Sequence, residues 1–360
     1  MSKVINSLQV VKIATINGEI TLLTSGPLRL GGLHRSRTGC LTFEYIKPLS
    51  AKLKEATLEI AVTTTTDPSH VKWRLWINNF PLTREFKPQN TIELKEEYFN
   101  KVLFDITPIL HARESEEIKL AIKYDGPGEI EINHANLVLA FEAKEAVSSY
   151  AYFSGALIIP PNESSKFSVP LNVIDKYSGE LKAIALAKSR HSVASIYVNN
   201  KEVFSLSGLS DLEEIHVENI QVKNNNEIEV KHEIHRENAI KKPIYLSTFI
   251  LASTKIIKPY VRIKDVKLIA DDRNPRLVVK IANVGQSCPD KLWLLLIDTG
   301  IIINRLKLPC LKPGEEQEIE MPFKKQLRSK HLLSLRTVWT KLSRTFFEET
   351  RLTTSLTDNA

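Results

Sequence analysis

The chain has 360 residues, of which 42% are hydrophobic and 25% are charged, and its formal net charge is +7. This composition is typical of a folded soluble protein and excludes disorder over any large part, while the length predicts two or three domains. The most apolar run, residues 292–297, is far too short for a membrane-spanning helix.

Short alternating segments separated by turn residues follow one another along the whole chain. The first predicted strands are Ser7–Ile13, Glu19–Leu23, Leu41–Ile46 and Ala56–Thr64. Helix-like windows such as Ile106–Ala112 and Asp175–Tyr177 are long enough only for a single helical turn. The sequence therefore predicts an all-β fold.

A basic, glycine-containing loop follows the second strand, in the segment Leu30-Gly-Gly-Leu-His-Arg-Ser-Arg37. Backbone amides freed by Gly31 and Gly32, together with the guanidinium groups of Arg35 and Arg37, could hold a phosphate or a carboxylate. The segment lacks the spacing of a P-loop and opens no helix, which argues against nucleotide binding. It is predicted as a contact for an anion or a partner, with an ordinary exposed loop as the alternative.

The first two thirds of the chain contain an internal repeat. Trp73–Asn79 and Ala194–Asn200 both alternate and end in Asn-Asn, a pair that tolerates positive φ and favours a tight hairpin. Later strands follow in the same order in each copy and end at Phe141 and Ala252. This pattern resembles the jelly-roll sandwiches of the galactose-binding type. The resemblance implies two tandem jelly-roll domains, with a carbohydrate as one candidate ligand.

Trp73 and Trp76 are the candidate aromatic contacts of the first repeat. Paired aromatic rings are a common way to stack sugar rings. Residues three apart on a regular strand, however, face opposite sides of the sheet. One indole is therefore expected in the core, and the other is available to a ligand.

The polar stretch Ser189-Arg-His-Ser192 is the candidate contact patch of the second repeat, through Arg190 and His191. A nucleophilic site that combines this stretch with Asp175 or Asp211 is the alternative, but no nucleophile elbow accompanies it. His232 and His235 point to opposite faces of a strand, which argues against a metal site there. We expect no catalytic residue, no metal site and no cofactor.

The last third carries two further strand patterns. One alternates through Leu277, Val279 and Ile281 and breaks at Asn-Val-Gly, and the other follows a Pro-Gly turn. Together they resemble the CARDB domain over residues 258–325. The resemblance implies an immunoglobulin-like sandwich of a kind that serves adhesion, spacing or interaction. Trp293 and Trp339 are predicted to fill the core of this sandwich.

The excess positive charge lies in this last domain. Residues 256–360 hold 19 Lys and Arg against 12 Asp and Glu, whereas residues 1–255 hold 30 of each. The densest part includes Lys324, Lys325 and Arg328, which are predicted contacts for nucleic acid, an anionic surface or an acidic protein. A solvated basic face is the alternative reading.

The three cysteines, Cys40, Cys288 and Cys310, lack the spacing of a zinc ribbon or a thioredoxin motif. Cys288 and Cys310 share the last domain, where they are either isolated thiols or a disulfide. Abundant Ile, Lys and Glu suit a thermophilic origin. The CARDB resemblance is compatible with an archaeal source, since that module is found in archaeal and bacterial proteins. The beginning of the sequence lacks the apolar segment of a secretory signal, so a cytoplasmic protein is expected, with an extracellular location as the alternative.

We therefore predict three tandem β-sandwich domains: residues 1–145 and 146–255, both jelly-roll-like, and residues 256–360, immunoglobulin-like. The predicted function is that of a non-catalytic structural or protein-interaction protein, acting with protein partners or by self-association. Carbohydrate binding is one alternative. The second is a glycan-processing hydrolase whose dispersed acids, such as Glu44, Asp105 and Glu142, meet only in the folded chain.

Overall fold

The computed structural model describes residues 7–44, 48, 50–95, 97–112, 117–187, 189–208, 210–234, 242–269, 276–322 and 333–352. Strands form most of this part of the chain, which confirms the all-β prediction. The chain divides into two compact units: unit 1 comprises residues 1–47 and 52–255, and unit 2 comprises residues 48–51 and 256–360. Among the described residues, no helix has the length and apolarity needed to cross a membrane.

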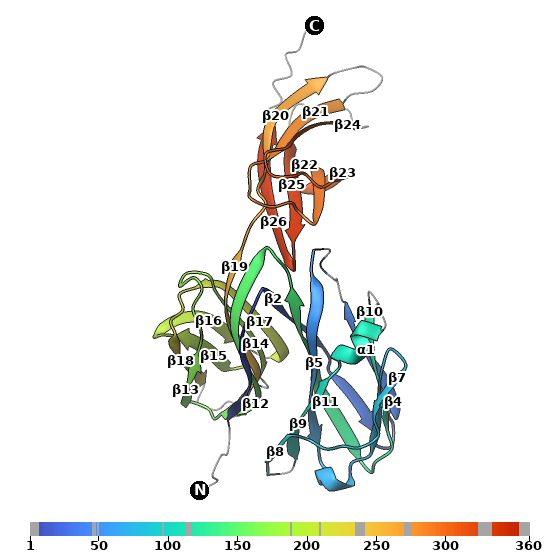
Figure 1. Ribbon diagram of the computed structural model, residues 1–360. Helices are drawn as coiled ribbons and strands as arrows, with labels where there is room; N and C mark the ends of the chain where they lie inside the picture. Colours follow the sequence, from blue (N-terminus) through green and yellow to red (C-terminus); the bar gives the residue numbers. More distant parts are fainter. Residues whose placement is uncertain are drawn as a thin grey trace. The chain divides into compact units, whose positions relative to one another are not determined.

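The first sandwich of unit 1 is built from a six-stranded and a four-stranded antiparallel sheet (Figure 1). The larger sheet has the order β2 (Gly18–Ser25), β11 (Glu129–Glu142), β5 (Lys52–Thr64), β9 (Tyr98–Asp105) and β8 (Asn90–Glu93), and β3 (Leu28–Gly31) also pairs with β11. The smaller sheet has the order β4 (Thr38–Glu44), β10 (Glu117–Tyr124), β6 (Trp73–Ile77) and β7 (Phe80–Thr83). The helical segments of the described chain are the short η1 (Pro68–His70) and α1 (Thr107–Ala112).

The second sandwich repeats this strand order. Its larger sheet runs through β1 (Leu8–Ile16), β12 (Ala146–Ile159), β19 (Ile244–Ile256), β14 (Gly179–Ala187) and β17 (Ser210–Ile220). Its smaller sheet runs through β13 (Ser164–Pro170), β18 (Asn225–Ile234), β15 (Ser192–Val198) and β16 (Lys201–Ser207). The order β2-β11-β5-β9 thus matches β12-β19-β14-β17, and β4-β10-β6-β7 matches β13-β18-β15-β16. This agreement supports an internal duplication.

The Asn-Asn hairpins occupy equivalent places in both sandwiches. Positive φ values between 47° and 68° occur at all four positions, Asn78, Asn79, Asn199 and Asn200. Two successive residues of this conformation make the two-residue turn whose twist suits a hairpin. The side chain of Asn78 accepts a hydrogen bond from the amide of Lys119 at 2.8 Å. Asn199 accepts the equivalent bond from Glu227 at 3.2 Å, so each hairpin is tied to the neighbouring strand in the same way.

The N-terminal strand crosses the predicted division at residue 145. β1 pairs with β12 from Leu8 opposite Gly155 to Ile16 opposite Ser148, and so extends the larger sheet of the second sandwich. β2 follows directly and pairs with β11 of the first sandwich. The chain can change sheets here because residue 18 is glycine: a Cβ at Gly18 would lie 1.7 Å from the carbonyl oxygen of Phe141.

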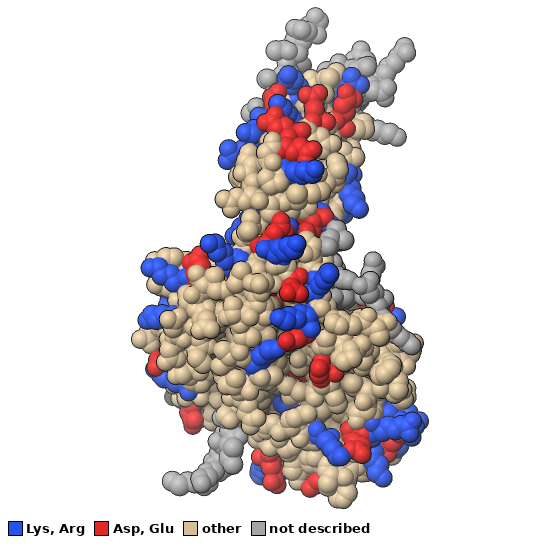
Figure 2. All heavy atoms as spheres, viewed as in Figure 1, with Lys and Arg blue, Asp and Glu red and all other residues tan. Residues whose placement is uncertain are grey.

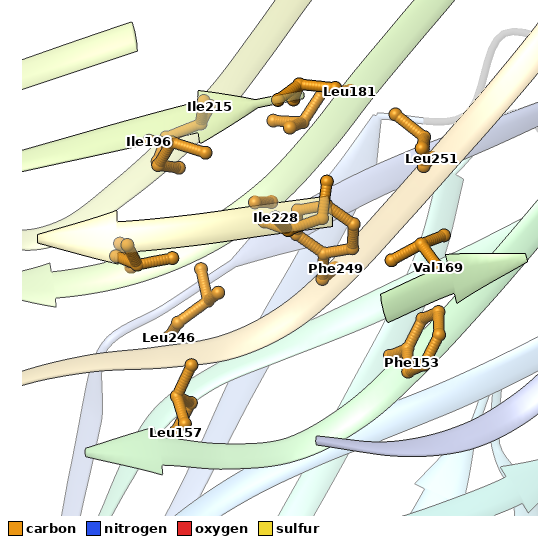
Figure 3. Close-up of a cluster of buried hydrophobic side chains, with 14 of the residues drawn as sticks. Phe153, Leu157, Val169, Leu181, Ile196, Ile215, Ile228, Leu246, Phe249 and Leu251 are labelled. Carbon is orange, nitrogen blue, oxygen red and sulfur yellow. The ribbon is translucent and has the colours of Figure 1, made fainter. Parts of the chain in front are cut away.

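The larger sheets of the two sandwiches pack against each other within unit 1. One buried cluster combines Ile16, Ile20, Leu22, Val138 and Ala140 with Tyr150, Tyr152, Ile184, Ile250 and Ala252. The opposite face of the second sandwich's larger sheet lines its own core, where Phe153, Leu181 and Phe249 meet (Figure 3). Strands β11 and β19 are therefore buried on both faces, which accounts for their nearly continuous apolar sequences.

Unit 2 is a smaller antiparallel sandwich. One sheet has the order β20 (Val261–Ile269), β21 (Arg276–Asn283) and β24 (Glu316–Pro322), and the other has the order β23 (Ile301–Leu308), β22 (Lys291–Asp298), β25 (Leu333–Lys341) and β26 (Arg344–Leu352). The Asn-Val-Gly corner is held by Asn283, which is fully buried. Its side-chain nitrogen Nδ2 donates hydrogen bonds to the carbonyl oxygens of Ser287 and Leu311, both at 2.8 Å.

Trp339 fills the core of unit 2, as predicted. Its ring is 2% exposed, and Nε1 donates a hydrogen bond to the carbonyl oxygen of Pro259 at 3.2 Å. The prediction for Trp293 is wrong. Leu292 and Leu294 belong to the core cluster, so Trp293 between them points to the other face of β22, where it is partly exposed.

Cys288 and Cys310 are both free thiols in the structure. Burial and a hydrogen bond between the two thiols raise the pKa of Cys310 to about 11. We predict that a mild oxidant joins them, closing a loop of about twenty residues and stabilising unit 2 by about 3 kcal/mol. Thiol titration should then detect Cys40 alone, and the unfolding temperature should rise. Cys310→Ser should abolish both effects, and a titration in which all three thiols persist after oxidation would contradict the prediction.

Candidate binding surfaces

A buried ion pair lies between the two larger sheets of unit 1. Lys101 on β9 pairs with Glu59 on β5, and the two side chains are 1% and 0% exposed. Glu59 also accepts hydrogen bonds from Tyr152 at 2.6 Å, from Asn136 at 3.2 Å and from Thr248. Burial lowers the pKa of Lys101, and the Glu59 carboxylate opposes that shift. Four donors thus converge on one carboxylate that is sealed from solvent.

The same network continues to His134 on β11. The Lys101 ammonium donates a hydrogen bond to Ser247 Oγ at 2.8 Å, and His134 Nε2 lies 2.8 Å from the same oxygen. Burial, and then the Lys101 charge, holds the pKa of His134 well below its usual value of 6.5. The imidazole is therefore neutral in the folded chain. Since sliding one sheet over the other would leave these groups unpaired, the network fixes the alignment of the two sandwiches.

The neutral His134 predicts a loss of stability in acid. The unfolded chain binds a proton at this residue below about pH 6.5, whereas the folded chain does not, so the stabilisation is present above that pH and is lost as pH falls. We expect the free energy of unfolding of the wild type to fall by up to about 1.4 kcal/mol per pH unit more than that of His134→Gln. Urea unfolding between pH 7.5 and 5 measures this difference. His70→Gln, at an exposed histidine, is the control. Equal slopes of the unfolding free energy against pH in all three proteins would contradict the prediction.

A cleft of about 370 Å³ adjoins the network in unit 1. Tyr152, whose hydroxyl donates to Glu59, is one of its walls. The other polar lining residues are Lys12, Glu55, Thr57, Asp105, Thr107 and Tyr150. The apolar lining residues are Val11, Ile20, Val138 and Ala140. The lining of the cleft therefore combines apolar side chains with carboxylates, hydroxyls and one ammonium group.

The two carboxylates of the cleft are already engaged. Glu55 forms an ion pair with Lys12, and the two side chains are 39% and 38% exposed. Asp105 accepts a hydrogen bond from the amide of Thr107 at 2.9 Å at the start of α1. The side-chain and backbone hydrogen bonds of Thr107, and the nearby Lys12 charge, lower the pKa of Asp105. Burial, and then Glu55, raises the pKa of Tyr150 to about 12, so its phenol remains a neutral donor.

The three acids considered for a hydrolase do not share this cleft. Asp105 lines it, but Glu44 lies in the smaller sheet of the first sandwich, opposite Glu117. Glu142 is the last residue of β11, opposite Lys52. These three carboxylates therefore do not converge as the hydrolase alternative would require. Glu55, which the sequence reading missed, is the acid that accompanies Asp105 in the cleft.

The prediction that the glycine loop offers free backbone amides to an anion is also wrong. The amide of Gly31 donates to Ser36 O at 3.0 Å, and the amide of Gly32 donates to Gly128 O at 2.7 Å. These amides are therefore not available to a ligand. Arg35 and Arg37 are exposed, and Arg35 pairs with Glu129 at 3.1 Å.

Trp73 and Trp76 lie on opposite faces of β6. Trp73 is 1% exposed, and its Nε1 donates to Glu85 O at 2.8 Å, whereas Trp76 is partly exposed. Trp73 is therefore a core residue and not a ligand contact. Trp76 remains a predicted contact.

The predicted patch of the second repeat has an exposed Arg190 and a partly buried His191. Asp175, its suggested acidic partner, instead caps a turn by accepting the amide of Tyr177 at 3.0 Å. His232 is fully buried, with its ring nitrogens 2.9 Å from Ser192 Oγ and 3.0 Å from Ile159 O. His235, Lys324, Lys325 and Arg328 lie outside the described residues.

One group of possible metal ligands occurs in the described part of the chain: Glu180, His216 and Glu218, with ligand atoms within 4.8 Å of one another. The Lys182 ammonium lies 2.8 Å from Glu180 Oε1, and His216 Nε2 lies 2.7 Å from the same oxygen. Lys182 thus already supplies the positive charge that Glu180 needs, and a metal ion would meet like charge. We regard this group as an ion-pair cluster.

Unit 2 carries a second candidate surface on its four-stranded sheet. We call it the outer face: the side of β23-β22-β25-β26 opposite the core residues of that sheet. The strand register aligns its side chains in three rows: Lys307, Trp293, Val338 and Phe347; Arg305, Leu295, Arg336 and Glu349; and Ile302, Ile297, Ser334 and Arg351. Phe347 and Ile302 are 62% and 55% exposed. Leu295, Ile297 and Ser334 in the middle of this face are buried. Its exposed apolar side chains, Phe347 and Ile302, lie on the two edge strands among basic residues.

Two arginines of the outer face lie over aromatic rings. The guanidinium carbon of Arg305 is 5.2 Å from the ring centroid of Trp293, and that of Arg336 is 5.0 Å from that of Phe347. Arg336 also donates to Glu349 at 3.0 Å through Nε. Such cation–π contacts hold the guanidinium groups in place. Figure 2 shows basic and acidic residues interspersed on the side of unit 2 in view, so net charge alone does not locate this surface.

No protein-family model matches the sequence, and no curated protein matches it. Among solved structures, the chain is similar to a glycosyl hydrolase family 2 member from Bacteroides cellulosilyticus, at 12% identity and a TM-score of 0.24, covering 56% of this chain and 28% of that one. It is also similar to the β-glucuronidase of Ruminococcus gnavus, at 10% identity and a TM-score of 0.21, covering 57% and 35%. The chain thus spans about a third of those proteins or less, and at such TM-scores the likeness carries no argument about activity.

Proposed function

We propose that this chain is a non-catalytic interaction protein whose binding surface is the outer face of unit 2. The observation that carries the proposal is the exposure of Phe347, Ile302 and part of Trp293 on one sheet face among four arginine and lysine side chains. Exposed apolar groups among polar neighbours mark interaction sites, and aromatic residues and arginine are enriched in them. The resemblance of residues 258–325 to CARDB modules is part of the same proposal, because it implies adhesion or interaction.

The electrostatics of the unit 1 cleft favour the non-catalytic reading. A glycan hydrolase of the usual kind needs a carboxylic acid with a raised pKa near a second carboxylate. The pKa of Asp105 is shifted in the opposite direction by its hydrogen bonds from Thr107. Glu55 is occupied by Lys12. Asp105 is therefore not set up to donate a proton at neutral pH.

The proposal is tested by capture from an extract of the source cells with the full-length chain as bait. The wild type is compared with Phe347→Ser/Arg305→Ala, which alters the outer face, and with Lys280→Ala, which removes an exposed charge from β21 in the other sheet. We expect the wild type and Lys280→Ala to retain the same partner and the double variant to lose it. Equal capture by all three proteins would remove the outer face as the binding surface.

A second candidate function is the binding of a small saccharide in the cleft of unit 1. Each of the two carboxylates keeps acceptor positions beyond its bond to Lys12 or Thr107, and two tyrosines and four apolar residues complete the lining. Two carboxylates against one ammonium favour a neutral polyol over an anion. A saccharide that binds there raises the unfolding temperature of the wild type but not of Glu55→Gln. Glu44→Gln, outside the cleft, is the control. A saccharide panel without any shift would remove this candidate.

A further inference from the structure

The charge of the outer face selects an anionic partner. The rows of this face hold four basic side chains, Arg305, Lys307, Arg336 and Arg351, against one acid, Glu349. Lys291, two residues before Trp293 on the same side of β22, adds a fifth. Lys291, Arg305 and Lys307 form no ion pair with any other described residue. Two copies of this face would repel each other, so self-association through it is disfavoured. A polyanion, in contrast, gains by releasing its counterions.

The aromatic rings narrow the choice among polyanions. We infer that the outer face binds single-stranded nucleic acid, an inference that rests on the proposed function of this face. Unpaired bases stack on aromatic rings and on arginine guanidinium planes. Trp293 with Arg305 and Phe347 with Arg336 each present such a layered pair on one open sheet. An acidic polypeptide would pair with the cations but has no planar groups to stack on these rings. In a duplex, the bases are already stacked and paired, so they are not available to the rings.

The spacing of the cations suits a nucleic-acid backbone. Lys307 and Arg305 are two residues apart on β23, and residues at this spacing on one face of a strand are separated by about 7 Å. Phosphates along an extended single strand are separated by a similar distance. A nucleic-acid strand lying across β23 to β26 would place bases over Trp293 and Phe347, which share one row. Its phosphates would lie against the cations of the two edge strands, Lys307 and Arg305 on β23 and Arg351 on β26. Because the face would contact phosphates and the faces of the bases, we expect little preference for nucleotide sequence.

The test is an anisotropy titration of a labelled oligo(dT) of about twelve nucleotides with the full-length chain, at about 50 and about 200 mM salt. We expect Lys307→Ala and Arg351→Ala each to weaken binding and to reduce the salt slope by about 0.7. Trp293→Leu should weaken binding about tenfold with an unchanged slope, since stacking releases no ions. Lys280→Ala removes the same charge from the other sheet, where it pairs with Glu316 at 2.6 Å, and should have no effect.

Competition with poly-glutamate and with a sulfated polysaccharide separates the outcomes. Unlabelled oligo(dT) is the reference competitor. If either polyanion displaced the labelled oligo(dT) at a lower concentration than unlabelled oligo(dT) does, and Trp293→Leu did not change the affinity, the nucleic-acid inference would be overturned. The outer face would then remain an interaction surface. Equal weakening by Lys280→Ala and Lys307→Ala would show that binding does not use this face. Absence of oligo(dT) binding at the lower salt concentration overturns the nucleic-acid inference alone. The proposed function is overturned separately, if the capture experiment shows no difference between the wild type and Phe347→Ser/Arg305→Ala.

Discussion

Replacing Glu59 by glutamine is expected to lower the free energy of unfolding of unit 1 by about 3–5 kcal/mol, because it leaves the Lys101 ammonium buried without a counter-charge. Lys101→Met should cost less, by about 1 kcal/mol or more. In that variant the Glu59 carboxylate keeps its donors Tyr152, Asn136 and Thr248, whereas in Glu59→Gln the ammonium keeps one hydroxyl, that of Ser247, and a neutral amide.

The control for this prediction lies on the same strand. Glu55 pairs with Lys12 near the surface, and Glu55→Gln should change the stability by no more than about 1 kcal/mol because solvent screens the pair. The shift of the urea midpoint, followed by circular dichroism, measures all three variants. If Glu59→Gln behaved like Glu55→Gln, the interface between the two sandwiches would have to admit water, contrary to the burial of Lys101.

Local sequence signals determine the turns of this protein well. Two successive asparagines predict a hairpin because both must adopt positive φ, and they do so at Asn78 and Asn199 and their successors. The Asn-Val-Gly corner is also marked by its own residues. Gly285 is required there since a Cβ would lie 2.3 Å from the amide of Tyr260. Strand positions follow for the same reason, because alternation records which face is buried.

Residues that depend on long-range packing could not be found in this way. Glu59 stands in a run that includes Ala56, Leu58 and Ile60, and nothing in that run shows that its second face meets another sandwich. Its partner Lys101 is 42 residues away. The pairing of β1 with β12 spans a still longer stretch and depends on how the sandwiches face each other. The cleft and the buried network both arise from the contact between the two sandwiches, so neither could be predicted from the sequence.

The two tryptophans of unit 2 are expected to have different roles, Trp339 in stability and Trp293 in binding. Every residue of the run Leu292–Ile297 is apolar, so alternation could not show that Trp293 faces outward while Trp339 faces the core. Trp339→Ala should lower the stability of unit 2 by about 3–5 kcal/mol, since a large buried ring leaves a cavity. Trp293→Ala should cost about 1 kcal/mol, through its lost contact with Arg305.

Binding should show the opposite order. Trp293→Ala should weaken the capture of oligo(dT) about tenfold because its ring is a stacking plane. Trp339→Phe, which retains a core aromatic ring and keeps unit 2 folded, should bind as the wild type does. Calorimetry and the anisotropy titration measure the two effects on the same protein samples. A Trp293→Ala variant that lost as much stability as Trp339→Ala would show that Trp293 is a core residue after all, and the outer face would then lose the ring on which its binding role depends.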